Sequence, residues 1–276
     1  DLEAVLAENN SANNQQIKDL QDPTDAQDAV TKNYTYSKAE VDALIANIQS
    51  QIDNTETTSV TDIDGNTYNY ITYGDQDWTV DNAAMETYRD GTPIPQVTDA
   101  TEWENLTTGA WAYYNNDPTK GKLYNWYAVM GIHDTDESTP NKEFAMEGWH
   151  VPSDTEWTTL ENQLIANGYN YDDTTTENKI AKAMASTTGW NTSTGTGAIG
   201  NDQSTNNSSG FNTFPEGFRD SDASFSGEGK ASIFWNSTMY DSDDESLRFL
   251  NWSLSYLLRL EGNTKQDGLS VRFVRD

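Results

Sequence analysis

The stretch Gly148-Trp-His-Val-Pro-Ser-Asp-Thr-Glu-Trp157 carries the strongest local signal in the chain. Ser153 followed three positions later by Glu156 is a capping box, in which the two side chains satisfy free N–H groups at the start of a helix. The next apolar residues fall on one helical face, and Gly168 is suited to end the helix. We therefore predict an amphipathic helix with a buried face formed by Trp157, Leu160 and Leu164.

Segments on either side of this helix carry strand signals. Thr67–Tyr73 alternates and is rich in Tyr, Thr and Ile, and a Gly-Asp turn then leads into Gln76–Val80, which predicts a β-hairpin. Near the other end, alternation over Leu269–Phe273 predicts a half-buried strand. Helical spacing predicts a shorter helix around Glu177–Ala185. Two helices and a small antiparallel sheet indicate an α+β domain.

Composition restricts the classes of partner. The chain of 276 residues has 45 acidic and 16 basic residues, a formal net charge of -29, which repels nucleic acid and anionic membrane surfaces. No apolar run approaches the roughly 20 residues that span a bilayer, so we expect no membrane insertion. The absence of cysteine excludes a disulfide framework, a thiolate zinc site and a cysteine nucleophile.

Composition also changes near residue 60. All nine tryptophans lie within residues 60–276, which we interpret as one folded head with enough aromatic bulk for a core. Residues 1–59 are rich in Ala, Asn, Gln and Asp, and we interpret them as a helical stalk and linker. Asp53–Ser59 is polar and turn-forming, which is typical of a hinge between the two.

The stalk region carries a heptad pattern. Ser37 and Glu40 form another capping box, and apolar residues then alternate spacings of four and three. This seam consists of Val41, Ile45, Ile48 and Ile52. Isoleucine at both core positions favours three strands over two, so we expect a homotrimeric coiled coil. The alternative is a single amphipathic helix that lies on the head.

Three phrases occur in order along the head: Gly121–Val129, Gly148–Trp157 and Gly268–Asp276. Together they resemble the Fibrobacter succinogenes major paralogous domain. The resemblance implies a variant of the C-type lectin fold, with small antiparallel sheets, two helices, long loops and a surface that binds a ligand. Leu20–Tyr34 is similar to a linker phrase of trimeric phage tail fibres, which implies that fibre or baseplate components contact the stalk.

The resemblance also implies structural roles for several residues. Phe234-Trp-Asn-Ser-Thr238 matches the family's aromatic-Trp-Ser-Ser-Thr motif, and we expect its tryptophan to fill the core. Many relatives have cysteines at the positions of Ala145 and Phe273. We infer that apolar packing of Phe273 near Ala145 replaces a disulfide of those relatives.

The ligand site is expected on a late strand. From Leu250 to Leu260 apolar residues occupy the even positions, which predicts a strand with one face on the core and a polar row outside. An ordinary solvated sheet face is the alternative explanation. Lectin-like folds bind ligands here, and some relatives resemble targets of diversity-generating retroelements that rewrite Met239–Thr264. The expected ligand-binding residues are Tyr240, Asp241, Asn251, Ser253, Ser255 and Arg259, with Trp111–Tyr114 as the second choice.

Metal and catalytic sites are less well marked. Asp220–Asp222 and Asp241–Glu245 are the densest candidates for Ca²⁺, although neither reproduces an EF-hand loop and acidic runs are usually solvated. We expect that no cofactor is required for binding. His133 lies in an acidic loop and His150 in a family motif, and neither suggests a triad. We therefore expect no enzyme.

These observations predict an extracellular adhesin at the tip of a trimeric fibre, displayed on a virion, an injection apparatus or a bacterial surface. Its head would attach to a host through a cell-surface glycan or protein receptor. One alternative is a structural cap or spacer that touches no receptor. A glycan-active enzyme is the least favoured alternative.

The stalk generates the first testable prediction. The full chain should sediment as a trimer, because association buries the apolar seam that a lone helix leaves in water. Ile45→Asp combined with Ile48→Asp should convert the trimer to a monomer with a folded head. A monomeric parent chain at micromolar concentration would contradict the prediction.

Overall fold

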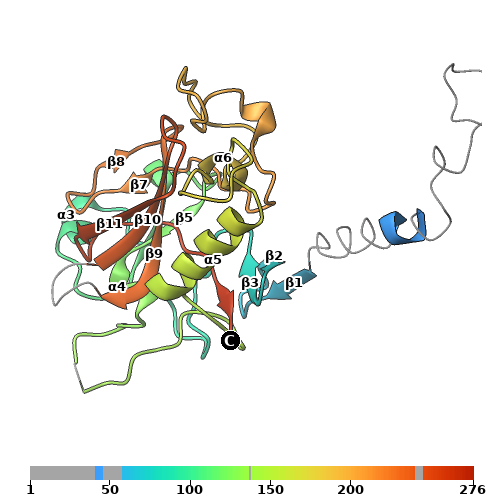
Figure 1. Cartoon of the computed structure of the whole chain (residues 1–276). Coiled ribbons are helices and arrows are strands. Elements are labelled where there is room, and N and C mark those ends of the chain that lie inside the picture. The colour runs from blue at the N-terminus through green and yellow to red at the C-terminus, as the bar shows by residue number, and fades with distance from the viewer. Residues whose placement is uncertain (1–40, 46–57, 137, 240–244) are drawn as a thin grey trace, which may run out of the picture. The chain divides into compact units, whose positions relative to one another are not determined.

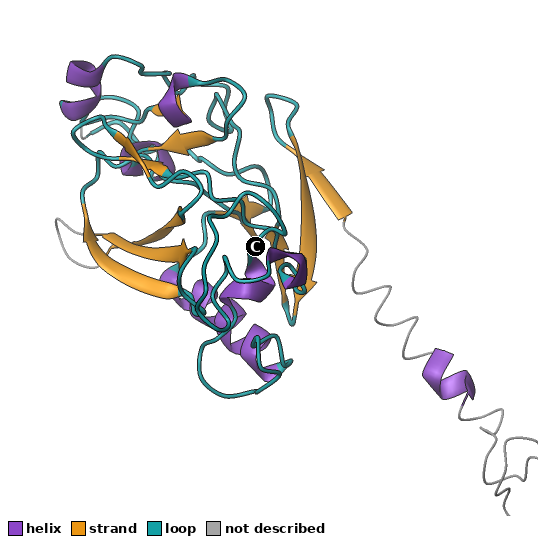
Figure 2. Cartoon of the chain, turned by 90° about the horizontal axis from the view of Figure 1, so that it is seen from above, coloured by secondary structure: helices purple, strands orange, loops and turns teal. Residues whose placement is uncertain are grey.

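A computed structural model describes residues 41–45, 58–136, 138–239 and 245–276 of the protein (Figure 1). The chain divides into two units, Asp1–Asn54 and Thr55–Asp276. In the described residues of the second unit, the fold is a mixed α+β head with few helices and small antiparallel sheets. Loops and turns connect most of these short elements (Figure 2).

In the first unit, the described residues 41–45 are helical. Val41 and Ile45 of the predicted seam have exposed side chains there, at 39% and 58%. The capping box at Ser37 and the seam residues Ile48 and Ile52 lie outside the described residues. The coiled coil and the trimer therefore stay predictions.

The largest sheet of the head has five strands in the order β1-β2-β3-β12-β6. Its strands are β1 (Thr58–Thr61), β2 (Thr67–Tyr73), β3 (Gln76–Thr79), β6 (Trp149–His150) and β12 (Val274–Arg275). The predicted hairpin is confirmed, because β2 and β3 pair with Tyr73 opposite Gln76. Strand β12, which directly follows the predicted strand segment Leu269–Phe273, pairs with this hairpin through Val274 opposite Trp78.

A second sheet has three strands in the order β11-β10-β9. They are β9 (Ala231–Met239), β10 (Glu245–Asn251) and β11 (Leu258–Asn263). Two smaller sheets have two strands each. One pairs β4 (Trp111–Tyr113) with β5 (Lys122–Tyr124), and the other pairs β7 (Phe218–Arg219) with β8 (Phe225–Ser226). The described α-helices of the head are α3 (Ala100–Glu104), α4 (Trp126–Val129), α5 (Asp154–Ala166) and α6 (Ala181–Met184). Helix α5 contacts β2, β9 and β10, and so joins the two larger sheets (Figure 1).

Helix α5 has the predicted start and buried face. Ser153 is its N-cap and forms the complete capping box with Glu156. Its buried residues are Trp157, Leu160 and Leu164. The second predicted helix, Glu177–Ala185, is longer than the observed α6 of four residues. Glu177 has a left-handed backbone with φ of 63°, and Ala185 is extended and bridges Thr213, so neither end can continue a helix.

The prediction of a half-buried strand over Leu269–Phe273 is wrong, because every residue in it is at most 2% exposed. The segment is hydrogen-bonded to other parts of the head along its length. Leu269 exchanges backbone hydrogen bonds with Tyr124 of β5, and the N–H of Ser270 donates to the carbonyl of Ile233 in β9. Other parts of the head therefore cover both faces of this segment. The alternation of apolar and polar residues does not reveal that the polar face is also covered.

Tryptophans of the family phrases are buried in the core of the head. Trp126, Trp149 and Trp235 belong to one buried cluster, which confirms the core role expected for the motif tryptophan. The indole N–H of Trp235 donates to the carbonyl of Tyr124 at 2.7 Å. Phe273 is fully buried in the same cluster as Ala145, and its ring centroid lies 5.8 Å from that of Phe144. Apolar packing at these positions is confirmed.

His150 ties the last residue of the chain to the start of α5. Its Nδ1 lies 2.6 Å from a carboxylate oxygen of Asp276, and its Nε2 lies 2.7 Å from one of Glu156. Burial acts to lower the pKa of His150, but the hydrogen bonds and charges of Asp276 and Glu156 outweigh it and raise the pKa above 6.5. Two carboxylates favour the doubly protonated ring, because only the imidazolium donates from both nitrogens.

This arrangement predicts a pH-dependent contribution to stability. Because the pKa of folded His150 is raised, its stabilisation is complete below the unfolded value and is lost as pH rises through the folded value. The melting temperature of His150→Gln should therefore fall further below that of the parent at about pH 6 than at about pH 8.5. The same substitution at His133 serves as the control. An equal deficit of His150→Gln at both pH values would contradict the prediction.

Candidate ligand-binding surface

The predicted strand Leu250–Leu260 is wrong, because the chain turns within it. Strand β10 ends at Asn251 and β11 begins at Leu258. The Asn251 side chain accepts hydrogen bonds from the backbone N–H of Ser253 at 3.0 Å and from its hydroxyl at 2.7 Å. Such an Asn-centred turn redirects the backbone. The period-two pattern therefore runs across a hairpin and its connection, and does not follow one strand.

The predicted ligand residues accordingly do not form one row. Asn251 ends β10, Ser253 and Ser255 lie in the connection, and Arg259 lies on β11. Ser253 is exposed, and the carbonyl of Ser255 accepts a hydrogen bond from the N–H of Ala181, which ties the connection to α6. Tyr240 and Asp241 lie outside the described residues. The structure thus brings four of the six into one hairpin without aligning them on a face.

Arg259 occupies a defined position on this hairpin. Its side chain is 44% exposed, and its Nε donates to Asp154 Oδ1 at 2.8 Å. A second hydrogen bond joins its Nη1 to the carboxylate of Glu261. Both bonds hold the guanidinium at the surface, where part of it stays accessible to a ligand.

Arg248 lies directly opposite Arg259 in the β10–β11 register but is buried, at 1% exposure. Its Nη1 lies 2.7 Å from Asp154 Oδ1, and its Nε lies 2.6 Å from Glu161 Oε1. Burial opposes ionisation of Asp154, but hydrogen bonds from Arg259 and Arg248 outweigh it and lower the pKa. Burial dominates at Glu161 and raises its pKa despite Arg248. This ion cluster fastens the hairpin to the first turns of α5.

The contact of Arg248 with Asp154 has no signal in the local sequence. Arg248 reads as one polar position in a strand, and Asp154 reads as an acidic residue favourable at a helix N-terminus. Only the pairing of β10 with β11, and the packing of α5 against β10, bring these residues within hydrogen-bond distance. No local pattern encodes that contact.

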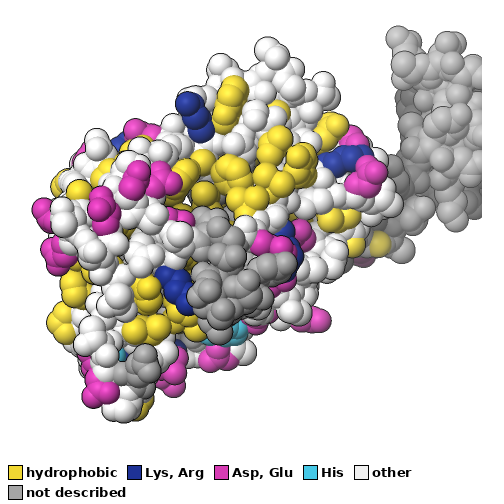
Figure 3. All heavy atoms as spheres, turned by 90° about the vertical axis from the view of Figure 1, so that its left-hand side faces the viewer, with side chains coloured by type: hydrophobic (Ala, Val, Ile, Leu, Met, Phe, Trp, Pro, Cys, Tyr) yellow, Lys and Arg dark blue, Asp and Glu magenta, His cyan; other side chains and the backbone are white. Residues whose placement is uncertain are grey.

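Apolar groups accompany the charged ones on the hairpin. Phe249 and Leu258 lie directly opposite each other, and both are half-buried. Tyr256 in the connection is 40% exposed. On the molecular face in Figure 3, hydrophobic side chains gather in the upper middle of the view, and acidic side chains lie mostly toward its edges. Mixed apolar and charged surface of this kind suits recognition of a ligand.

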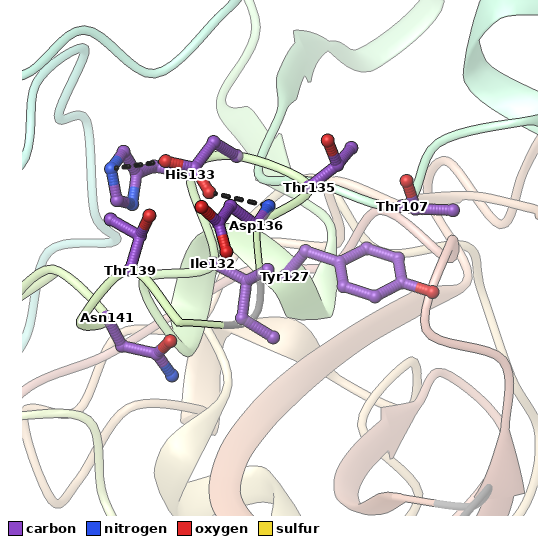
Figure 4. A pocket seen from close by; sticks show the side chains of 9 residues that line it. Thr107, Tyr127, Ile132, His133, Thr135, Asp136, Thr139 and Asn141 are labelled. Atoms are coloured by element: carbon purple, nitrogen blue, oxygen red, sulfur yellow. Dashed lines mark hydrogen bonds and ion pairs between the residues drawn. The ribbon is translucent and has the colours of Figure 1, made fainter.

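A cavity of about 360 Å³ lies next to the loop that follows β11. Tyr127 of α4 and residues of the 132–141 loop line it, and the Tyr127 ring extends toward Thr107 (Figure 4). The side-chain amide of Gln266, in the loop after β11, donates to the Tyr127 hydroxyl at 3.4 Å. The sequence gives no signal for this cavity, because Tyr127 stands in it only as part of the phrase Gly121–Val129.

The second-choice aromatic stretch is mostly unavailable. Trp111 and Tyr114 are 4% and 7% exposed, and the Trp111 indole donates to the carbonyl of Ile94. Their burial makes them part of the core, with Tyr113 half-buried between them. The expectation of a ligand platform at Trp111–Tyr114 therefore loses its physical basis.

The acidic segments differ in what the structure describes. Asp222 accepts a hydrogen bond from the N–H of Ser224, and the N–H of Asp220 donates to the carbonyl of Ser224, as in a local turn. Within the described ranges, no group of three or more acidic or histidine side chains is placed to hold a metal ion. Most of Asp241–Glu245 lies outside those ranges, so its calcium prediction is untested.

Comparison with known proteins identifies one family. The model described as Fibrobacter succinogenes major domain matches residues 71–275, which include the first two phrases of the head and all of the third except its last residue, Asp276. No curated protein and no solved structure matches the chain. Among the described residues, no helix is long and apolar enough to cross a membrane.

The two paired arginines should respond differently to substitution. Arg248→Met should lower the free energy of unfolding by about 3 kcal/mol, because it leaves Glu161 without its buried partner. Arg259→Ala should cost less than about 1 kcal/mol, since exposed ion pairs contribute little. Urea unfolding of both variants measures the contrast. Equal losses would show that Arg259 is a structural residue and not an available surface group.

Proposed function

The chain belongs to the Fibrobacter succinogenes major domain family, and from this premise we propose that its head is a ligand-binding module of the C-type lectin type. In this proposal the ligand surface is the β10–β11 hairpin with the β9–β10 loop, and the ligand is a glycan or protein on a cell surface. The head acts by binding and not by catalysis.

The observation that carries the proposal is the placement of Arg259. Arginine is among the side chains most often found at binding hot spots. Here Asp154 and Glu261 hold its guanidinium at the surface, and Arg248 fastens the same hairpin to α5. A side chain ordered before binding loses less conformational entropy when a ligand arrives. The hairpin therefore supplies a fixed cation beside apolar surface.

The proposed setting is a trimeric extracellular fibre on a virion, an injection apparatus or a bacterial surface. The heptad seam of the stalk supports it, since three joined heads would convert weak single-site contacts into avidity. Fibre or baseplate components would contact the stalk, and Ca²⁺ bound near Asp241–Glu245 would be an optional addition. Sibling sequences that differ mainly within Met239–Thr264 would support targeting by a diversity-generating retroelement.

A structural cap or spacer is the second candidate. The ion pairs of Arg259 favour it, because both hydrogen-bonding carboxylates belong to the head itself. In that case Arg259 stabilises the hairpin and contacts no receptor. The two functions make opposite predictions for attachment to cells.

Attachment of the full chain to candidate host cells and to a glycan array tests the proposal. Combined Tyr240→Ala and Arg259→Ala substitutions should reduce bound protein at least tenfold with a nearly unchanged melting temperature. Arg275→Ala is the matched control, because Arg275 is also exposed and paired with one carboxylate, that of Asp77. Equal attachment of the parent, the double variant and the Arg275→Ala control would show that the hairpin is not the binding site. Attachment by none of them, including the parent, would favour the cap.

A further inference from the structure

Three arginines are buried in the head, and one of them lacks the hydrogen bonds of the other two. Arg219, Arg248 and Arg272 are each at most 2% exposed. The Arg219 guanidinium donates to the carbonyls of Ala223, Val97 and Thr98 and stacks on Trp103. Arg248 has two carboxylate partners. Both groups thus offset the cost of burying a charge.

Arg272 has far fewer partners. Its Nη1 donates to the carbonyl of Thr79 at 3.1 Å, and its Nε is buried without any hydrogen bond. Its charge lies 4.8 Å from the ring centroid of Phe211, and within the part of the chain that the structure describes it forms no ion pair with a carboxylate. Burial lowers the pKa of Arg272 to about 10, despite the nearby charges of Asp81 and Glu216. Buried donors without partners are rare in folded proteins.

Arg272 lines a cavity of about 440 Å³, and Asn82 in the same lining also has an unused hydrogen-bonding atom. The Asn82 amide nitrogen donates to Glu216 Oε2 at 2.8 Å, while its amide oxygen is buried without a partner. Burial raises the pKa of Glu216. One buried donor, the Arg272 Nε–H, and one buried acceptor, Asn82 Oδ1, therefore belong to residues of the same cavity and have no hydrogen-bond partner among the described residues.

The wall and rim of the cavity add two features. Gly121 permits the close approach of Glu216, since a Cβ there would lie 2.3 Å from its Oε2. Phe214 lines the cavity with 44% of its surface exposed, and the half-buried Tyr113 lines it as well. Exposed aromatic surface at a polar cavity suits a ligand that is apolar on one face and hydrogen-bonding at its edge.

We propose that this cavity is a second binding site of the head, and that it takes a neutral pyranose unit. Adjacent hydroxyl groups both donate and accept, so one pair can accept from Arg272 and donate to Glu216. The cavity lining carries both signs of charge, so an anion would meet the carboxylates of Asp81, Glu86 and Glu216, and an organic cation would meet Lys120, Lys122 and Arg272. A neutral polyol meets neither repulsion, and the C–H face of a sugar ring can pack on Phe214.

This site uses none of the residues proposed for the β10–β11 hairpin, so the two proposals fail independently. The test titrates the full chain with methyl glycosides of glucose, galactose, mannose and fucose by saturation-transfer NMR. At least one should bind with a Kd of about 1 mM or tighter. Phe214→Ala and Glu216→Gln should each weaken that binding at least tenfold, and the hairpin double variant should not.

Tyr171→Ala is the matched control, because Tyr171 is a similarly exposed aromatic residue, at 39%, that does not line this cavity. Circular dichroism must show that Phe214→Ala and Glu216→Gln remain folded, and an unfolded variant is replaced by Phe214→Leu or Glu216→Asp. The proposal is overturned if no glycoside binds, since the cavity then holds only water. Binding that survives both substitutions, or stronger binding of acetate or inorganic phosphate than of every glycoside, also overturns it.

Discussion

The head depends on the hydrogen bonding of its closing segment, Leu269–Arg275. In seven residues this segment bonds to β5 through Leu269, to β9 through Ser270 and to β3 through Phe273 and Val274. Val274 also pairs with His150 of β6. Short strands of two to four residues cannot form stable sheets by themselves. One segment that bonds to several of these strands supplies the long-range contacts that each pair lacks.

The packing of the closing segment and of its partner strands also buries three arginines in this acidic protein. The closing segment carries Arg272 into the interior, and β7 and β10 carry Arg219 and Arg248. With 45 acidic and 16 basic residues, the chain offers many carboxylates, yet only Arg248 of the three is paired with them. Arg219 is satisfied by carbonyls, and Arg272 is the least satisfied. The differences follow from which backbone and side-chain oxygens the packing brings close.

Local signals predicted the elements that depend on local physics. The capping box at Ser153 and the buried face of α5 are set by contacts within a few residues, and the hairpin of β2 and β3 is set by its two-residue turn. The burial of Leu269–Phe273 depends on segments that are distant in the sequence. The turn after Asn251 depends on the side-chain amide of that one residue, which stands in an otherwise regular alternation of apolar and polar residues. For the same reason, the sequence indicates that residues 251–259 lie near the surface, but it does not indicate how their backbone turns. Asp154 and Arg248 became recognisable only once strand pairing had placed them together.

The separation of the two surfaces has a physical basis in how each is supported. The hairpin gains its order from ion pairs to α5, so its exposed connection can change sequence while Arg248 continues to fasten the strands. Arg272, by contrast, stands in a segment whose backbone joins several sheets, and Asn82 bonds directly to Ser270 of that segment. Substitution of Arg272 or Asn82 therefore disturbs the interior, whereas substitution in the hairpin connection disturbs a surface. Under the proposed function, sequence change in the hairpin connection would alter receptor specificity and leave the interactions that support the cavity intact.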